Sequence, residues 1–388
     1  MKNRSHYKYL LASGHVCSDI NQGVLSAILP FLIAAHHYDY ATAATLVLVA
    51  NIAGSVVQPL LGHLADRKNI PWSMSLGLLM AGSGMAATGY ISNFWGLCLA
   101  VMISGIGIAM FHPTAALLVN KAAEPGKQGA AISIFAVGGN LGFTLGPVLT
   151  TTAISVWGMK GTLVLLVPVI LESVLLISQN SSLTEIGKNE KSVKQGGTKS
   201  KLQEDDWNGF YKMCVIVFGR SIIFYGMNTF LALFCIQVLG QTKVGGNSIL
   251  TLFYGVCALC TFFGGRLADR YGYKKIIRLS FLVIFPFILL LSQTTTLWLA
   301  LLLIVPAGMA IGLCYSPIVV TGQNMLPSHK GLASGVTLGL AVSIGGIFAP
   351  LLGKIANTFG LSTAILAISC VSIVPLIFSF WLPGDAQF

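Results

Sequence analysis

Long apolar runs dominate the chain, and short polar or charged segments separate them. An α-helix needs about 20 mostly apolar residues to cross the hydrocarbon core of a bilayer. The alternation of apolar and polar residues that barrel strands require is absent, so helices are the remaining way to span. We therefore predict an all-α membrane protein with twelve transmembrane helices, over residues 8–35, 41–62, 71–91, 94–119, 129–154, 160–178, 209–238, 244–265, 274–293, 296–320, 331–354 and 361–381.

The composition agrees with this prediction. Of 388 residues, 55% are hydrophobic and only 9% are charged, whereas a soluble domain carries about 25% charged residues. This excludes an ordinary soluble enzyme, a disordered chain and a nucleic-acid binder.

The positions of the basic residues predict the orientation. Twelve spans place both termini on one side, and that side holds 19 of the 23 Lys and Arg residues. The opposite side holds Lys160, Lys243 and Lys354, and Arg220 lies inside a span. By the positive-inside rule, both termini are cytoplasmic. We expect a bacterial inner (plasma) membrane protein whose net charge of +11 reflects topology.

A polar segment divides the chain into two similar halves. We predict that residues 179–208 form a solvated cytoplasmic linker between six-helix bundles at 1–178 and 209–388. The string Gly62-His-Leu-Ala-Asp-Arg67 returns 203 positions later as Gly265-Arg-Leu-Ala-Asp-Arg270. Such a duplication predicts two pseudo-symmetric bundles with a binding site near the bilayer midplane.

Three further landmarks repeat at nearly the same offset. Pro113 returns as Pro317 and Pro147 as Pro350, while Gly14-His15 aligns with Gly219-Arg220. The repeat therefore extends through both halves.

The duplicated Gly-x-Leu-Ala-Asp-Arg string resembles the signature of the major facilitator superfamily. The second copy matches through Lys275, whereas the first departs at Asn69 and Pro71. The resemblance implies a gating motif in which an acid meets a base or a helix N-terminus across the cytoplasmic bundle interface. Its residues here are Gly62, Asp66, Arg67, Gly265, Asp269 and Arg270.

Shorter strings in the first half resemble the fosmidomycin-resistance family of drug exporters. They are Gly14–Asp19, Val57–Gly62, Ser104–Gly107, Phe111–Pro113 and Ser133–Asn140. This resemblance implies proton-driven export of a drug or a drug-like anion.

Ionisable groups inside spans are the candidate chemistry, because each costs about 2.5–3.5 kcal/mol at a helix centre. His15, Asp19 and Gln22 share one face of the first span, and Arg220 lies at a similar depth in its symmetry mate. Asp19 is a candidate proton carrier and His15 the alternative. Arg220 is a candidate anion anchor, with Gln22 as a further substrate contact. A static Asp19–Arg220 ion pair is the structural alternative.

Other polar groups in the spans have less defined roles. Glu172 is equally a proton-coupling or a structural residue, and His112 either lines the cavity or packs. Candidate substrate contacts are also Asn51, Asn140, Tyr225, Asn228 and Tyr315.

Residues Gly142, Gly146 and Pro147 resemble a motif of facilitator antiporters, although close helix packing accounts for them equally well. The place where such antiporters often carry an Arg is Val101 here. This absence shifts proton coupling to Asp19, His15 and Arg220.

No phosphate-binding loop, metal-ligand spacing or paired nucleophile is apparent, so we expect no cofactor, no metal and no enzymatic activity. The resulting prediction is a monomeric secondary transporter that exports a small drug-like or anionic compound in exchange for protons by alternating access. Import of an organic anion by the same fold, as a symporter or uniporter, is the alternative. A receptor that has lost transport and an intramembrane enzyme are more distant alternatives.

Overall fold

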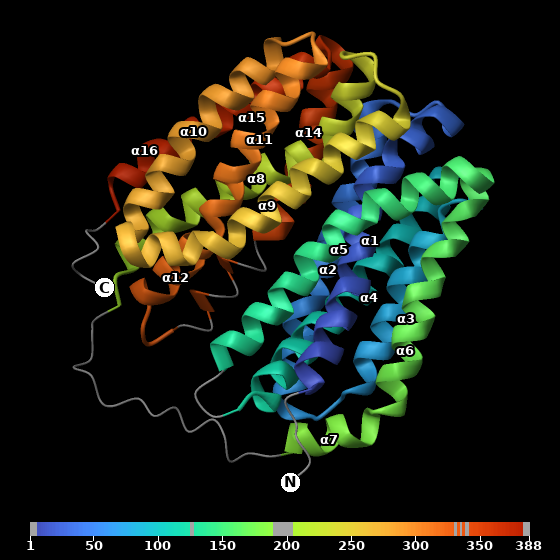
Figure 1. Cartoon of the computed structure of the whole chain (residues 1–388), viewed down its shortest axis with the longest axis vertical. Helices are drawn as coiled ribbons and strands as arrows, with labels where there is room; N and C mark the ends of the chain where they lie inside the picture. The colour runs from blue at the N-terminus through green and yellow to red at the C-terminus, as the bar shows by residue number, and fades with distance from the viewer. Residues whose placement is uncertain are drawn as a thin grey trace. The chain divides into compact units, whose positions relative to one another are not determined.

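The computed structural model describes residues 6–124, 128–188, 205–329, 332–333, 336–337 and 341–382, so the predicted linker and the span 331–354 lie partly outside the described residues. Regular structure in this described part is helical throughout (Figure 1). The elements are α1 (Tyr7–His36), α2 (Tyr40–Arg67), α3 (Trp72–Ala87), α4 (Phe94–Ala122), α5 (Gln128–Trp157), the 3-10 helix η2 (Gly158–Leu165), α6 (Leu166–Ser178), α7 (Asn180–Lys188), α8 (Trp207–Gln237), α9 (Lys243–Tyr271), α10 (Tyr273–Gln293), α11 (Leu297–Leu313), α12 (Tyr315–Met325), α14 (Ala341–Phe359), α15 (Leu361–Val371) and α16 (Ile373–Phe380).

Apart from α7, these helices overlap the predicted spans. Among the described residues, nine helical stretches are long and apolar enough to cross a membrane, and one of them, Ala131–Ser178, is long enough for two spans. The shorter apolar helices α3 and α14 occupy two further predicted spans.

The outer surface suits lipid. Along α6, Leu171, Val174 and Ile177 are each more than half exposed, which is unfavourable in water and favourable in hydrocarbon. Trp95 and Trp298 are the second residues of α4 and α11 and are 79% and 82% exposed. Tryptophan concentrates at membrane interfaces, so this pair, 203 positions apart, extends the duplication.

Prolines explain two helix breaks that the sequence analysis did not predict. A proline ring clashes with the carbonyl four residues earlier. Four residues before Pro317 is Leu313, where α11 ends, and four before Pro375 is Val371, where α15 ends. The predicted spans 296–320 and 361–381 are therefore each built from two helices.

The chain forms two compact units, and each is described by itself. One consists of Met1–Ile28 and Val49–Thr198, and the other of Leu29–Leu48 and Lys199–Phe388. The second unit thus includes the end of α1 and the start of α2. There the backbone N–H of Tyr40 donates to Asn357 Oδ1 at 2.8 Å.

The start of the predicted linker is folded rather than solvated. Helix α7 buries Leu183 and Ile186, two apolar residues three apart and therefore on one helical face. Asn69 donates to the Thr184 carbonyl at 2.5 Å, and Lys121 Nζ donates to the Gly187 carbonyl at 2.7 Å. These bonds fix α7 to the ends of α2 and α4.

Candidate functional site

A buried polar cluster lies midway along α1, in the first unit. His15 and Asp19 are one helical turn apart, so their side chains reach one another along the same face. His15 Nε2 lies 3.2 Å from Asp19 Oδ2, and the two side chains are 11% and 6% exposed. Gln22, on the same face, donates to Asp19 Oδ1 at 3.1 Å.

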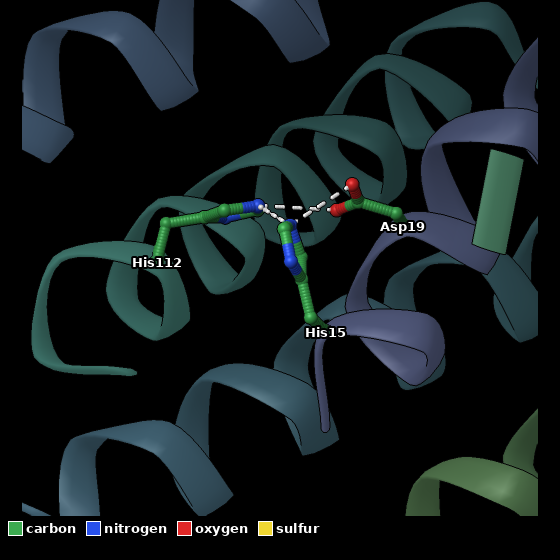
Figure 2. Close-up of side chains that lie close together, drawn as sticks. All are labelled: His15, Asp19 and His112. Atoms are coloured by element: carbon green, nitrogen blue, oxygen red, sulfur yellow. Dashed lines mark hydrogen bonds and ion pairs between the residues drawn. The ribbon is translucent and has the colours of Figure 1, made fainter. Parts of the chain in front are cut away.

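The third ionisable member comes from α4. His112 Nε2 lies 3.1 Å from Asp19 Oδ1 and 3.2 Å from His15 Nε2. Figure 2 shows the three side chains converging on one point. We call His15, Asp19 and His112 the triad. The sequence analysis named all three residues but did not place His112 against the other two.

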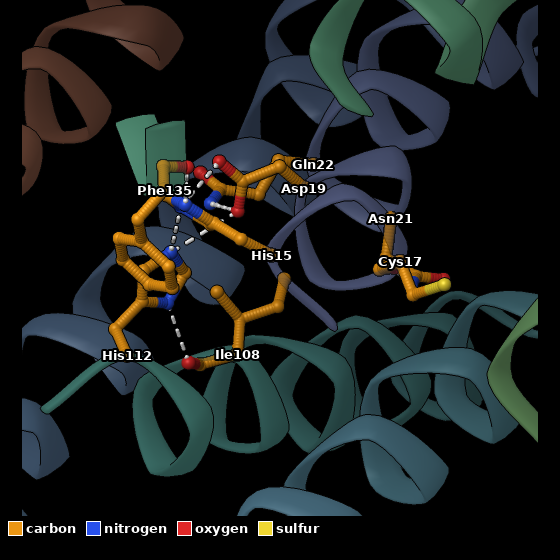
Figure 3. A network of polar contacts seen from close by, with 8 residues as sticks. All are labelled: His15, Cys17, Asp19, Asn21, Gln22, Ile108, His112 and Phe135. Carbon is orange, nitrogen blue, oxygen red and sulfur yellow. Dashed lines mark hydrogen bonds and ion pairs between the residues drawn. The ribbon is translucent and has the colours of Figure 1, made fainter. Parts of the chain in front are cut away.

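Backbone carbonyls fix both imidazoles. His15 Nδ1 lies 2.7 Å from the Phe135 carbonyl, and His112 Nδ1 lies 2.8 Å from the Ile108 carbonyl (Figure 3). A carbonyl only accepts, so each Nδ1 carries the hydrogen and each neutral ring presents its Nε2 lone pair to the triad. The Phe135 ring also stacks on His15, with centroids 4.0 Å apart.

This arrangement points acceptors at one another. With both imidazoles neutral, two Nε2 lone pairs face each other and an ionised carboxylate, and Gln22 supplies only one N–H to the group. Buried acceptors without donors are costly, about 1–3 kcal/mol each. A shared cation would satisfy these acceptors, and one proton would make the triad electrically neutral.

Glycines on α5 permit the triad. A Cβ added at Gly139 would lie 2.6 Å from both Asp19 Oδ2 and His15 Nε2, closer than real Cβ atoms approach other atoms. Gly142 lies against the backbone of α1 at Val16, and Gly146 against Gly23. The predicted close packing at Gly142 and Gly146 is thus present, and Pro147 follows within the same helix. Gly139 is a site residue that the sequence analysis missed.

Glu172 lies apart from the triad. It is buried, and its described polar contact is with Ser13 Oγ at 3.1 Å. Figure 3 shows Cys17 and Asn21 likewise on the side of α1 away from the triad. The two proton-coupling candidates Asp19 and Glu172 therefore belong to different polar sites.

Arg220 occupies the second unit, on α8. Its guanidinium lies 4.8 Å from the Tyr315 ring centroid and 5.9 Å from that of Phe224. Aromatic rings contact the face of a guanidinium, while its N–H donors point outward in the plane. The planar edge is thus suited to an anion. The predicted pairing of Arg220 with Asp19 would join the two units and stays a prediction.

Among the remaining polar candidates, two have buried atoms without a hydrogen-bond partner in the described part of the chain. They are Nδ2 of Asn51 and Oδ1 of Asn228. Tyr225 is buried beside Phe224, and Asn140 is partly buried on α5. Unsatisfied buried amides are the kind of group that a polar substrate can satisfy.

The second gating motif makes local contacts. Tyr273, at the start of α10, donates its hydroxyl to Asp269, and Arg270 lies 5.2 Å from the Tyr271 ring. Gly265 lies on α9. For the first copy, Gly62, Asp66 and Arg67 lie in α2, but their side-chain surroundings are outside the described residues.

An all-helical membrane fold of twelve spans in two similar bundles, with ionisable groups inside spans of both, defines the class of secondary transporters. The family model of the Major Facilitator Superfamily matches residues 11–350 and 213–387. The chain belongs to the Major Facilitator Superfamily, as the duplicated signature predicted.

Relatives narrow this assignment. The chain is 27% identical to the Fosmidomycin resistance protein of Escherichia coli (strain K12), covering 89% of this chain and 85% of that protein. It is also 27% identical to the uncharacterized MFS-type transporter YfnC of Bacillus subtilis (strain 168), covering 98% and 94%. The resemblance to the fosmidomycin-resistance family is thereby confirmed.

Solved structures support the fold. A crystal structure of a bacterial homolog to the human lysosomal transporter Spinster, inward-facing and unoccupied, matches with a TM-score of 0.81 at 17% identity, covering 100% of this chain and 98% of the other. A mutant of the nucleoside transporter NupG matches with a TM-score of 0.73 at 15% identity, covering 98% and 99%. The predicted twelve-helix, two-bundle fold is confirmed.

Proposed function

We propose that this chain is a proton-coupled antiporter that exports a small drug-like or anionic compound by alternating access. It works as a monomer in the bacterial inner membrane with both termini in the cytoplasm. Its partners are the substrate, protons and lipid, and it has no enzymatic activity.

The observation that carries this proposal is the triad. Its two Nε2 atoms and its carboxylate face one another at 3.1–3.2 Å, with both Nδ1 atoms held by carbonyls. A proton shared among His15, Asp19 and His112 satisfies this arrangement, and histidine exchanges protons near neutral pH. The triad is thus a more complete proton site than Asp19 or His15 alone.

Two observations support the substrate class. The guanidinium edge of Arg220 suits phosphonate or carboxylate oxygens, because a planar fork binds two oxygens at once. The Fosmidomycin resistance protein is similar over most of both chains. Fosmidomycin is therefore the first compound to test.

The test uses proteoliposomes that hold purified protein, an imposed pH gradient and a pH-sensitive dye. We expect fosmidomycin, or another compound of a small panel, to move protons through the wild type and not through Asp19→Asn. The matched control is Asp205→Asn, which alters another aspartate paired with a histidine, His329, before α8.

Normal pH-driven transport by Asp19→Asn would refute the role of the triad. If substrate and protons instead move in the same direction, the protein is the proton symporter that the sequence analysis gave as an alternative. If no compound of the panel moves protons through the wild type, the transport proposal is refuted.

A further inference from the structure

The triad also has the composition of a metal site. We propose that His15, Asp19 and His112 bind one divalent transition-metal ion, and that Zn²⁺ fits this set of two imidazoles and one carboxylate. This inference goes beyond the proposed function, since metal binding requires neither a substrate nor a proton gradient.

The distances between the ligand atoms agree with a shared ion. Zinc binds imidazole nitrogen and carboxylate oxygen at about 2.0–2.2 Å, so neighbouring ligand atoms of a tetrahedral site lie about 3.3–3.5 Å apart. Here the two Nε2 atoms are 3.2 Å apart, and they lie 3.2 and 3.1 Å from oxygens of Asp19. All candidate ligand atoms lie within 4.8 Å of one another. A small movement outward accommodates the ion.

The hydrogen bonds that orient the ligands are already in place. A metal-binding histidine usually donates its other ring N–H to a carbonyl or carboxylate, which fixes the tautomer and the ring orientation. Both imidazoles do this, His15 to Phe135 and His112 to Ile108. Gln22 orients the carboxylate of Asp19. Both Nε2 lone pairs are therefore directed at the position of the ion.

The ligand types select the metal. Imidazole nitrogen suits Zn²⁺, Ni²⁺, Co²⁺ and Cu²⁺, whereas Mg²⁺ and Ca²⁺ prefer oxygen ligands. Three protein ligands leave a fourth position for water or another ligand. His112 is 20% exposed, more than the other two side chains, so access is from its side.

This proposal departs from the expectation that the chain has no metal site. That expectation was based on the spacing of ligands along the sequence, and only His15 and Asp19 are close in sequence. The third ligand is 97 positions from His15, on another helix.

The experiment measures binding directly. Purified protein in detergent is dialysed against Zn²⁺, and the bound metal is counted by mass spectrometry, with Mg²⁺ in a parallel sample. We expect the wild type to retain one more equivalent of Zn²⁺ than His112→Gln or His15→Gln, and no Mg²⁺. Removing a ligand should weaken binding at this site by at least about 100-fold, since losing only a hydrogen-bond partner of a ligand costs 10–100-fold.

The matched control is His329→Gln, which removes a histidine from an exposed pair with Asp205. It should keep the wild-type equivalent. Thermal unfolding is the second readout, because an ion that binds only the folded state raises the melting temperature. Zn²⁺ should raise it for the wild type and His329→Gln but not for the triad variants.

Equal Zn²⁺ retention by the wild type and both triad variants would overturn the inference. If the folded wild type retains no Zn²⁺, the inference is overturned as well. Zinc binding at the triad without proton coupling would refute the proposed function alone, and proton coupling without zinc binding would refute this inference alone.

Discussion

Replacing Gly139 by alanine tests whether the triad depends on the close approach of α5. The added Cβ would lie 2.6 Å from Asp19 Oδ2 and from His15 Nε2, whereas ordinary contact begins at 3.4 Å. The atoms must therefore separate by about 0.8 Å, and overpacking of this kind costs about 1–3 kcal/mol. Displacing Asp19 or His15 by that amount along the line of a contact would lengthen a distance of 3.1–3.2 Å beyond hydrogen-bond range.

We expect Gly139→Ala to fold with a lowered melting temperature and to lose proton-coupled transport. The assay combines thermal unfolding in detergent with dye-monitored proton movement in proteoliposomes. The matched control is Gly308→Ala on α11, where the added Cβ meets Phe253 and Val256 at 3.4 Å, an ordinary contact. Full proton coupling in a destabilised Gly139→Ala protein would show that the triad geometry is not needed, and unchanged stability with full coupling would refute the predicted clash.

Three other changes separate the roles of the remaining charged groups. Arg220→Lys keeps the charge but loses the planar fork and the stacking on Tyr315. The affinity for an anionic substrate, measured from the concentration dependence of transport, should therefore fall about 10-fold. Unchanged affinity would refute the role of Arg220 as the anion-binding residue. Glu172→Gln should change the transport rate by less than about twofold, because the glutamine side chain can still accept the hydrogen bond from Ser13. Loss of proton coupling in a folded variant would make Glu172 a second proton carrier. The backbone N–H of Ser328 donates to Asp205 and holds the pKa of that carboxyl below its ordinary value. The ionised form therefore stabilises the fold above the ordinary pKa of about 4, and this contribution is lost as the pH falls through the lowered value. Asp205→Asn should lower the melting temperature at pH 7 and flatten its dependence on acid pH; identical pH profiles would refute this.

Apolar runs and composition were sufficient for the helical spans, because each span must satisfy its own backbone hydrogen bonds and expose apolar side chains. The two-bundle arrangement was predicted from the duplicated Gly-x-Leu-Ala-Asp-Arg string. The helix breaks before Pro317 and Pro375 could not be predicted from proline alone, since prolines such as Pro113 and Pro147 lie inside helices that continue. The folded start of the linker was missed because Leu183 and Ile186 are the only two large apolar residues of α7, which is otherwise polar.

The candidate site was predicted only as far as local spacing reaches. His15, Asp19 and Gln22 follow from helical geometry, whereas the approach of His112 depends on how α1 packs against α4. One signal was available, the adjacent glycines Gly138 and Gly139 within an apolar span. Glycine inside a membrane helix commonly marks close contact with another helix, but the partner helix cannot be read from it.

The chemistry of the triad bears on the sign of the proposed coupling. A substrate whose anionic group bound beside the triad would attract a proton to it, so anion and proton would bind together and move in the same direction. Exchange instead requires that substrate and proton exclude one another. We infer that an exported substrate contacts the triad with a donor group, which replaces the shared proton between the Nε2 atoms and Asp19. Substrate added to weakly buffered protein in detergent should then release protons, and Asp19→Asn should abolish this release. Proton uptake by the wild type would mean that the anion reinforces protonation, which is the behaviour of a symporter.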